Sequence, residues 1–269
     1  MKELCQFNTP VWVAQALVDR HFPRLGSGDL VLEPSCGIGA FLQALPPAVR
    51  AVGVEIDPAV AERARENTGR EVLVGDFRSI EIPENPTAII GNPPFRADLI
   101  DGFLDRSYEL LPEGAKAGFI LPTYLFQTAG RVCRYGDRWS LSIELMPRNA
   151  FHARMRTPLL FALFEKNAAR RLIGFVLYRE CDDLHQMAKP YRELLSSYEG
   201  SIWMAVCRMA LRRLGGRAQL QEIYRELERN RPTRTEWWRE KIRQTLRAYG
   251  QVFEPKGEGV YELRLGKQP

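Results

Sequence analysis

The stretch Leu30-Val31-Leu32-Glu33-Pro34-Ser35-Cys36-Gly37-Ile38-Gly39-Ala40-Phe41 decides the fold. It has the pattern of a buried strand, a glycine-containing turn and the start of a helix. Gly37 and Gly39 allow the backbone to turn tightly and to approach a ligand closely. Leu42 stands where the dinucleotide-binding fingerprint has its third Gly or Ala, which disfavours a pyrophosphate ligand. The Glu33 carboxylate instead suits an ammonium or amino-acid group.

Short apolar runs alternate with helical patterns on both sides of this stretch, through the first 165 residues. The runs lie at 30–32, 51–54, 72–74, 88–90, 117–121, 142–145 and 159–164, and helices are expected at about 41–45, 59–67 and 99–111. Strands that are apolar throughout and separated by helices predict a mostly parallel sheet covered on both faces. The expected fold class is therefore α/β with seven strands. Such sheets bind ligands beyond the carboxyl ends of their strands.

An acidic residue follows each of the first three runs, namely Glu33, Glu55 and Asp76. The Glu55 carboxylate can accept two hydrogen bonds from ribose hydroxyls. Asp76 can accept one from an adenine amino group. A single acid in this position is about as often a helix cap or a turn residue. Three of them after three successive strands indicate a ligand that contains adenosine.

The motif Asn92-Pro93-Pro94-Phe95 follows the fourth run. An exocyclic adenine amine is a poor nucleophile because its lone pair is delocalised into the ring. Two hydrogen-bond acceptors, here the Asn92 side-chain oxygen and the Pro93 carbonyl, would localise that lone pair. The consecutive prolines fix φ and stiffen the loop, and Phe95 can stack on a base. An ordinary Pro-Pro turn is the alternative interpretation.

With these four motifs in this order, residues 6–165 resemble the class I S-adenosylmethionine-dependent methyltransferases, which have a Rossmann-like fold. Within that class they resemble the N6-adenine DNA methyltransferases of the gamma-type motif order. Gln6-Phe7-Asn8-Thr9-Pro10 looks like the N-terminal motif of this subgroup, which closes over the methionine part of the cofactor. The resemblance implies S-adenosylmethionine as the cofactor.

The resemblance also implies the roles of individual residues. The implied cofactor-binding residues are Thr9, Pro10, Glu33, Pro34, Gly37, Gly39, Glu55, Ile56, Asp76, Phe77 and Asn92. The implied catalytic residues, which would hold the target adenine, are Asn92, Pro93, Pro94 and Phe95. Phe151 is the best match to the aromatic residue that stacks on the other face of the base, Phe126 is the second choice, and either is alternatively a core residue. Cys36 occupies a variable motif position and is given no role.

The basic excess of the chain is confined to its C-terminal quarter. Residues 1–198 hold 23 Lys and Arg against 24 Asp and Glu, whereas residues 199–269 hold 15 against 9. A net charge of +6 on so short a segment is typical of a module that meets a polyanion. A merely solvated basic surface is the alternative. We divide the chain into a catalytic domain at 1–181, a connector at 182–198 and a small module at 199–269.

Three amphipathic helices and a hairpin are expected in the module, at 202–211, 220–227, 237–249 and 252–263. This order resembles a winged helix-turn-helix domain, in which the third helix enters the major groove and the wing touches the DNA backbone. The implied DNA-binding residues are Arg234, Arg239, Lys241, Arg243, Arg247 and Lys256. A solvated face or a protein-binding winged helix is the alternative.

Several other classes of protein are poor fits. No apolar run approaches the ~20 residues of a membrane span, and the N-terminus lacks the pattern of a signal peptide. Five scattered cysteines without CxxC spacing indicate a reducing, cytoplasmic compartment. His21, His152 and His185 show no metal-ligand spacing, and methyl transfer requires no metal. We therefore expect no membrane partner and no metal.

The sequence thus predicts a site-specific adenine-N6 methyltransferase that acts on a flipped adenine in double-stranded DNA. One alternative is an N-methyltransferase of ribosomal RNA or of protein glutamine, because such enzymes share the Asn-Pro-Pro-aromatic motif. Another is a DNA-binding regulator that only senses the cofactor. The recognition sequence, a restriction endonuclease partner or its absence, and the oligomeric state are left open by the sequence.

Overall fold

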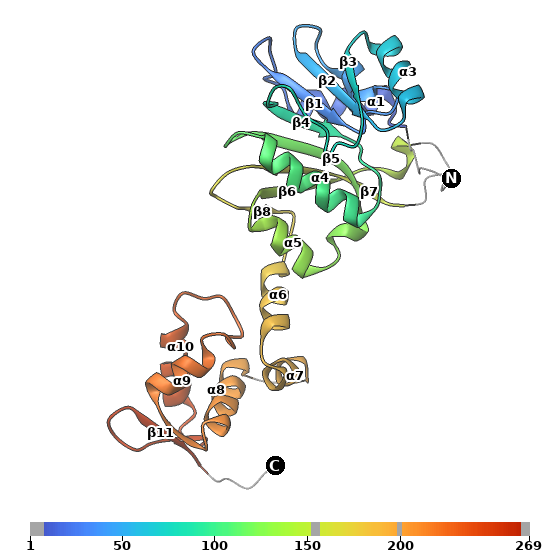
Figure 1. Ribbon diagram of the computed structural model, residues 1–269. Coiled ribbons are helices and arrows are strands. Elements are labelled where there is room, and N and C mark those ends of the chain that lie inside the picture. The colour runs from blue at the N-terminus through green and yellow to red at the C-terminus, as the bar shows by residue number, and fades with distance from the viewer. Residues whose placement is uncertain (1–7, 152–156, 198–200, 265–269) are drawn as a thin grey trace. The chain divides into compact units, whose positions relative to one another are not determined.

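The computed structural model describes residues 8–151, 157–197 and 201–264. The contacts within the chain divide it into two compact units, Met1–Val176 and Leu177–Pro269, which we call unit 1 and unit 2 (Figure 1). No helix in the described ranges is both long enough and apolar enough to cross a membrane.

Unit 1 is built around an eight-stranded sheet with the order β3-β2-β1-β4-β5-β7-β6-β8. Its strands are β1 (Leu30–Pro34), β2 (Arg50–Glu55), β3 (Glu71–Val74), β4 (Ala88–Gly91), β5 (Lys116–Pro122), β6 (Ser140–Leu145), β7 (Leu159–Glu165) and β8 (Leu172–Ile173). The first five strands pair in parallel, and β7 is antiparallel to both β5 and β6. The predicted α/β fold with a mostly parallel sheet is confirmed.

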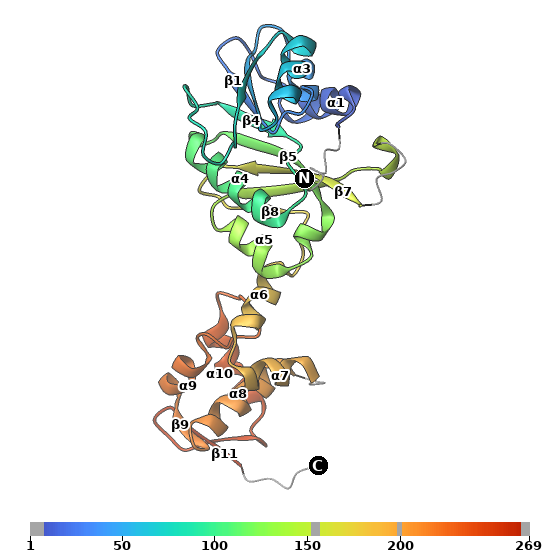
Figure 2. The same ribbon diagram turned by 45° about the vertical axis from the view of Figure 1, so that its right-hand side comes forward.

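The central strands are buried along their whole length because helices cover both faces of the sheet (Figures 1 and 2). The helical elements of unit 1 are α1 (Val11–His21), α2 (Ala40–Ala44), α3 (Pro58–Thr68), α4 (Ala97–Leu110), η1 (Thr123–Phe126), α5 (Ala129–Gly136) and η2 (Arg148–Ala150). Apolar residues of α1, α2 and α3 share one core cluster with Val31 of β1 and Ile120 of β5. Tyr135 of α5 packs edge-on against Phe164 of β7, with the ring centres 5.9 Å apart.

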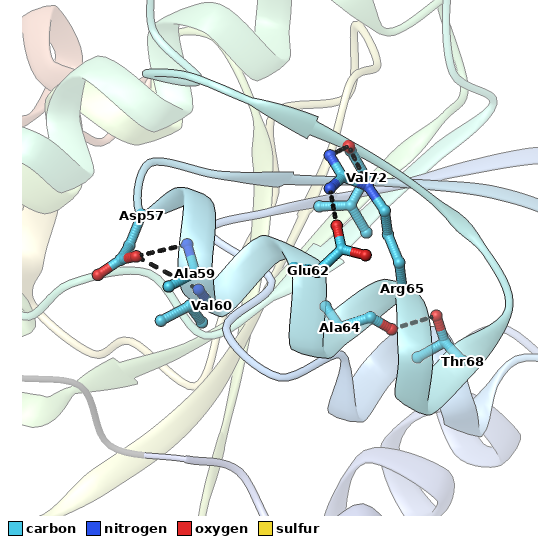
Figure 3. A network of polar contacts seen from close by, with 8 residues as sticks. All are labelled: Asp57, Ala59, Val60, Glu62, Ala64, Arg65, Thr68 and Val72. Carbon is cyan, nitrogen blue, oxygen red and sulfur yellow. Dashed lines mark hydrogen bonds and ion pairs between the residues drawn. The ribbon is translucent and has the colours of Figure 1, made fainter.

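Helix α3 shows how local sequence sets the bounds of an element (Figure 3). The Asp57 carboxylate accepts hydrogen bonds from two backbone N–H groups of the first turn. Pro58 occupies the first helical position, as predicted. Near the other end, the Arg65 guanidinium pairs with Glu62 at 2.7 Å and donates to the carbonyl of Val72 in β3. Local capping therefore begins the helix, and a long side chain ties it to the next strand.

The sheet of unit 1 has one strand more than the seven that the sequence predicts. β8 pairs in parallel with β6 at the edge of the sheet, with Leu172 opposite Leu141 and Ile173 opposite Ser142. A two-residue strand carries no periodicity in the sequence, so only the tertiary pairing reveals it.

Unit 2 contains five helices and a three-stranded sheet within its described residues. The helices are α6 (Tyr178–Gln186), α7 (Lys189–Ser197), α8 (Ile202–Arg213), α9 (Leu220–Leu227) and α10 (Trp238–Ala248). The strands β9 (Arg217–Gln219), β10 (Phe253–Pro255) and β11 (Val260–Leu263) form an antiparallel sheet in the order β10-β11-β9. The three expected helices and the hairpin are present, and β9 is an additional strand.

The predicted connector at 182–198 needs correction, because its described residues are largely helical. The end of α6 and the whole of α7 lie there, and the compact unit already begins at Leu177. Met187 and Tyr191 are 4% and 0% exposed in the core of unit 2. Their apolar neighbours are divided between two short helices with a break at Met187, so no single helical period is visible in the sequence.

Candidate active site

The site lies where the strand order of unit 1 reverses. β1 pairs with β2 on one side and with β4 on the other. β2 and β3 therefore extend the sheet on one side of β1, and β4 and β5 extend it on the opposite side. The carboxyl ends of neighbouring parallel strands diverge at such a point and leave a crevice. A pocket is present there, lined by Asn8, Thr9, Glu33, Ser35, Cys36, Gly37, Ile38, Ala40, Glu55, Ile56, Asn92, Pro93, Pro94 and Phe95.

Glu33 is a buried carboxyl group on the wall of this pocket, at the end of β1. It is 2% exposed, and one of its oxygens accepts a hydrogen bond from the backbone N–H of Leu42 at 3.0 Å. Burial raises the pKa of Glu33 well above its ordinary value of 4.5, while hydrogen bonds from the backbone at Leu42 and Phe41 act in the opposite direction. A cation in the pocket would stabilise the ionised form of Glu33.

Glu55, at the end of β2, braces the turn between β1 and α2. One carboxylate oxygen accepts from the N–H of Gly37 at 2.9 Å, and the other accepts from the N–H of Asp57 at 3.1 Å. Each carboxylate oxygen has two lone pairs, so both can accept a further hydrogen bond from a ligand. Next to Glu55, Ile56 is 55% exposed and adds an apolar surface to the same pocket.

The turn between β1 and α2 needs glycine at its last position. Gly39 has a φ of +86°, and a Cβ built there would lie 2.6 Å from Cγ2 of Thr68. A side chain at Gly39 would therefore be strained in its backbone and would clash with α3. Gly37 also has a positive φ, of +54°, although the space around its Cα is open enough for a Cβ.

The Asn92-Pro93-Pro94-Phe95 loop follows β4 and forms the opposite wall. The Asn92 amide donates from Nδ2 to the Thr9 hydroxyl at 3.1 Å, which links the loop to the segment before α1. The carbonyl of Pro94 accepts from the N–H of Arg96 at 2.8 Å. Within the described part of the chain, no hydrogen bond is formed to the Pro93 carbonyl. That oxygen is therefore available to a ligand.

The predicted site residues fall into two groups. All four predicted catalytic residues line the pocket, as do Thr9, Glu33, Gly37, Glu55 and Ile56. Pro10, Pro34 and Gly39 belong to the supporting backbone and do not line it. Asp76 does not line the pocket either, and its carboxylate pairs with the Arg78 guanidinium, which lowers the pKa of Asp76.

Phe77 is a core residue in this structure, in contrast to its predicted contact with the cofactor adenine. It is 2% exposed, and its ring packs against Phe103 of α4 with the centres 5.0 Å apart. The sequence could not separate the two roles, because an aromatic residue after a strand suits a core as well as a ligand.

Neither candidate for the second stacking aromatic lines the pocket. Phe126 is 3% exposed and packs against Tyr135 and Phe175, so it is a core residue. Phe151 is 6% exposed and belongs to the apolar cluster against which Phe95 packs. The residues that follow Phe151, 152–156, lie outside the described residues.

Four of the six predicted DNA-binding residues of unit 2 already have partners. Arg234 pairs with Asp183, Arg243 with Glu240, and Lys256 with Glu254 and Glu262. Arg239 lies over the rings of Trp238 and Tyr224. Lys241 and Arg247 are exposed and form no ion pair with any described residue.

The structure also adds residues to the site that the sequence did not assign. Asn8, Ser35, Cys36, Ile38 and Ala40 line the pocket. All of them lie inside the motifs quoted above, so their positions in those motifs were the available signal. Burial raises the pKa of the Cys36 thiol, which therefore stays protonated at neutral pH. The described residues contain no group of three or more His, Cys, Asp or Glu side chains that could hold a metal.

Known proteins resemble this chain in parts. No protein-family profile matches it. It is 43% identical over 68 residues to the type II methyltransferase M.CvrRI of Paramecium bursaria Chlorella virus XZ-6E. This match covers 24% of this chain and 18% of that protein. It is 34% identical over 116 residues to the tRNA (guanine(10)-N2)-dimethyltransferase of Methanothermobacter thermautotrophicus. This match covers 37% of this chain and 34% of that protein. The chain thus spans less than half the length of these curated relatives.

Among solved structures, the chain matches a Listeria monocytogenes protein assigned to the class I S-adenosylmethionine-dependent methyltransferases. The TM-score is 0.53 at 15% identity, over 65% of this chain and 66% of that one. Unit 1 therefore has the class I S-adenosylmethionine-dependent methyltransferase fold. Its sequence relatives include a second type II methyltransferase, M.TthHB8I of Thermus thermophilus, to which it is 30% identical over 129 residues.

The pocket fits this cofactor chemically. A buried carboxyl at Glu33 suits a cationic amino group, and the Glu55 carboxylate retains lone pairs for ribose hydroxyls. The exposed side chain of Ile56 offers an apolar surface for a purine. These groups line one pocket together with the Asn92–Phe95 loop, so a cofactor and a second substrate would meet there.

Proposed function

We propose that this protein is an S-adenosylmethionine-dependent methyltransferase that modifies the N6 amine of adenine in duplex DNA. One observation carries the proposal. The Asn92-Pro93-Pro94-Phe95 loop forms a wall of the same pocket as Glu33 and Glu55. The acceptors for a planar amine and the residues suited to the cofactor therefore belong to one pocket.

The loop performs its role through two oxygen atoms. The Nδ2 end of the Asn92 amide donates to the Thr9 hydroxyl, which fixes the orientation of the amide, and its carbonyl end is the first acceptor for the target amine. The Pro93 carbonyl, which has no hydrogen bond within the described residues, is the second acceptor. Accepting both N–H hydrogens localises the lone pair on nitrogen. Consecutive prolines hold these acceptors in place without further ordering.

S-adenosylmethionine supplies a methyl group already activated by its sulfonium charge. The chain therefore has to position the amine, to exclude water and to hold the base. Phe95 lies on the pocket wall and is suited to stack on the target base. Removal of an adenine from the DNA stack costs a few kcal/mol, which contacts in the pocket must offset. For Phe151 to stack on the other face, it would have to leave the core cluster that it occupies here.

Unit 2 is proposed to hold the DNA. Its elements follow in the order α8, β9, α9, α10, β10 and β11, which resembles a winged helix-turn-helix domain with α10 as the recognition helix. Exposed residues recur at Trp237, the N-cap of α10, and at Lys241, Gln244 and Ala248 within the helix, a spacing that places them on one face. Lys241 can contact a phosphate, and Gln244 is suited to the paired donor and acceptor on an adenine edge.

RNA is the second candidate substrate, because a tRNA guanine-N2 methyltransferase is also among the relatives. Guanine N2 is likewise a planar amine that needs two acceptors. The concentration of positive charge in the small unit with the helix order of a DNA-binding module favours DNA.

The test is methyl transfer from radiolabelled S-adenosylmethionine to unmethylated genomic DNA, total RNA and a protein extract. We expect label in DNA, with N6-methyladenine as the product in the hydrolysed nucleosides. Asn92→Ala should lower turnover by roughly 100- to 1,000-fold, the usual loss when one preorganised hydrogen-bonding group is removed from a transition state. Cofactor affinity should change little.

Asp98→Asn serves as the matched control, because Asp98 is an exposed residue just beyond the loop and pairs with Arg96. Its turnover should equal that of the wild type. Label in RNA alone, or near-normal turnover of Asn92→Ala, would refute the proposed function.

A further inference from the structure

A tyrosine outside the predicted motifs contacts the Asn92–Phe95 loop. Tyr124 lies in η1, directly after β5, and its hydroxyl donates a hydrogen bond to the backbone carbonyl of Phe95 at 2.7 Å. The tyrosine is 43% exposed, whereas the residues that follow it, Leu125 and Phe126, are 2% and 3% exposed. An exposed aromatic ring therefore has its polar end fixed on the loop that lines the pocket.

The element that carries Tyr124 is firmly attached to the sheet. The N–H of Thr123 donates to the carbonyl of Pro158 at 3.0 Å, which continues the pairing of β5 with β7. Leu125 and Phe126 anchor the other side of η1 in the core. Partial burial raises the pKa of Tyr124 above its ordinary value of 10.0, so the hydroxyl remains a donor at neutral pH.

Two hydroxyl groups thus hold the loop at its two ends. The Thr9 hydroxyl contacts the Asn92 side chain at the first residue, and the Tyr124 hydroxyl contacts the Phe95 carbonyl at the last. The intervening prolines have no N–H with which to form hydrogen bonds. Besides the hydrogen bond from the Arg96 N–H to the Pro94 carbonyl, these end contacts help to place the prolines and to orient the Pro93 carbonyl.

We propose that Tyr124 is a positioning residue that fixes the Asn92–Phe95 loop through its hydrogen bond to Phe95. The inference rests on the proposed function, because it requires that the loop binds the target amine. Tyr124 acts through the loop, and its hydroxyl is already engaged with the Phe95 carbonyl. The hydrogen bond matters for the chemical step, in which the two acceptors must meet both N–H groups at once.

The test compares Tyr124→Phe, which removes only the hydroxyl oxygen, with the wild type. Loss of one hydrogen bond is expected to lower kcat roughly tenfold. KM for DNA and the affinity for S-adenosylmethionine should stay within about twofold of the wild-type values. A merely structural role would instead lower the fraction of folded protein, so kcat is expressed per mole of cofactor-binding sites.

Tyr108→Phe is the matched control, because it makes the same change in α4, where the Tyr108 ring packs against Trp139. It should leave kcat unchanged. Tyr124→Leu removes the ring as well and separates stacking from positioning. Normal kcat in Tyr124→Phe combined with loss in Tyr124→Leu would overturn the positioning role in favour of the ring.

The two proposals fail in different ways. If the wild type methylates neither DNA, RNA nor protein, the proposed function is wrong, and this inference falls with it. If the wild type is active and Tyr124→Phe matches it in kcat, only the positioning role of Tyr124 is wrong.

Discussion

At the scale of single residues, burial decides which acids bear on cofactor binding. Glu33 lies at the end of β1 and Asp76 lies just after β3, on the far side of β2 in the sheet, and their environments differ. Glu33 is enclosed by the core, and desolvation raises its pKa well above 4.5. Asp76 lies beside the Arg78 guanidinium, which lowers its pKa. As the pH rises, Glu33 therefore holds its proton longer than Asp76 does.

This difference predicts that proton release accompanies cofactor binding. A cationic amino group near Glu33 favours the ionised carboxylate. At pH values below the raised pKa of Glu33, the affinity for S-adenosylmethionine should therefore increase with pH. Release of one proton limits this increase to about tenfold per pH unit. Calorimetric titrations between about pH 5 and 7, in buffers of different ionisation enthalpy, would count the proton. Glu33→Gln should abolish the pH dependence.

Asp76→Asn is the control, because Asp76 is already ionised over this range, and its pH dependence should match that of the wild type. The Glu33 carboxyl group also affects the stability of the fold in the absence of cofactor. Since the folded pKa of Glu33 is raised, its contribution to stability is complete below about pH 4.5 and is lost as the pH rises through the folded pKa. An unchanged proton count in Glu33→Gln would contradict the assignment.

At the scale of elements, α10 shows that basic residues on one helix are not equivalent. Arg243 is bound to Glu240 one turn earlier, and Arg239 lies over two aromatic rings. Lys241 is exposed on the face that also presents Trp237 and Gln244. Exposed pairs add little to stability, but they must be broken before the arginine can contact a phosphate.

Substitution of α10 residues should therefore have unequal effects on DNA binding. Lys241→Gln should weaken binding at low salt and reduce the slope of log K against log salt by about 0.9, the value for one phosphate contact. Arg243→Gln, the matched control on the same helix, should change the slope less. Fluorescence anisotropy with a labelled duplex at several salt concentrations measures both. Equal slopes in all three proteins would exclude this face as the phosphate contact.

At the scale of the whole molecule, charge and cofactor chemistry are divided between the two units. Unit 1 contains 20 Lys and Arg against 20 Asp and Glu, and unit 2 contains 18 against 13. The entire net charge of +5 thus belongs to unit 2, although its boundary lies earlier than the sequence predicts. The described pocket lining lies wholly between Asn8 and Phe95, in unit 1.

This division predicts two thermal unfolding transitions. S-adenosylmethionine should raise the midpoint temperature of only one of them, that of unit 1. At a cofactor concentration of 100 times Kd, the bound unit gains about 2.7 kcal/mol, which corresponds to a rise of roughly 5–10 °C for a unit of this size. Differential scanning calorimetry with and without cofactor measures the shift. Phe253→Leu, in the core of unit 2, should lower only the midpoint temperature of the unit 2 transition. A single transition that shifts as a whole would show that the units unfold together.

The sequence by itself determined seven of the eight strands of unit 1, the order of the motifs and most of the pocket lining. Glu33, Gly37, Glu55 and the Asn92–Phe95 loop could be identified because the carboxyl ends of neighbouring parallel strands meet at one edge of a sheet. A short motif placed directly after a strand has little freedom in where it lies. Local periodicity is likewise sufficient for most of the helices.

Only the tertiary structure decided which of several similar residues face the pocket, the core or a partner. Phe77 and Phe126 are core residues, Arg234 is bound to Asp183, and Tyr124 reaches the Phe95 carbonyl across 29 positions of the chain. These outcomes depend on contacts between distant segments, which leave no period or spacing in the sequence. The strands therefore place the motifs, but the packing of the elements around them determines which side chains can act.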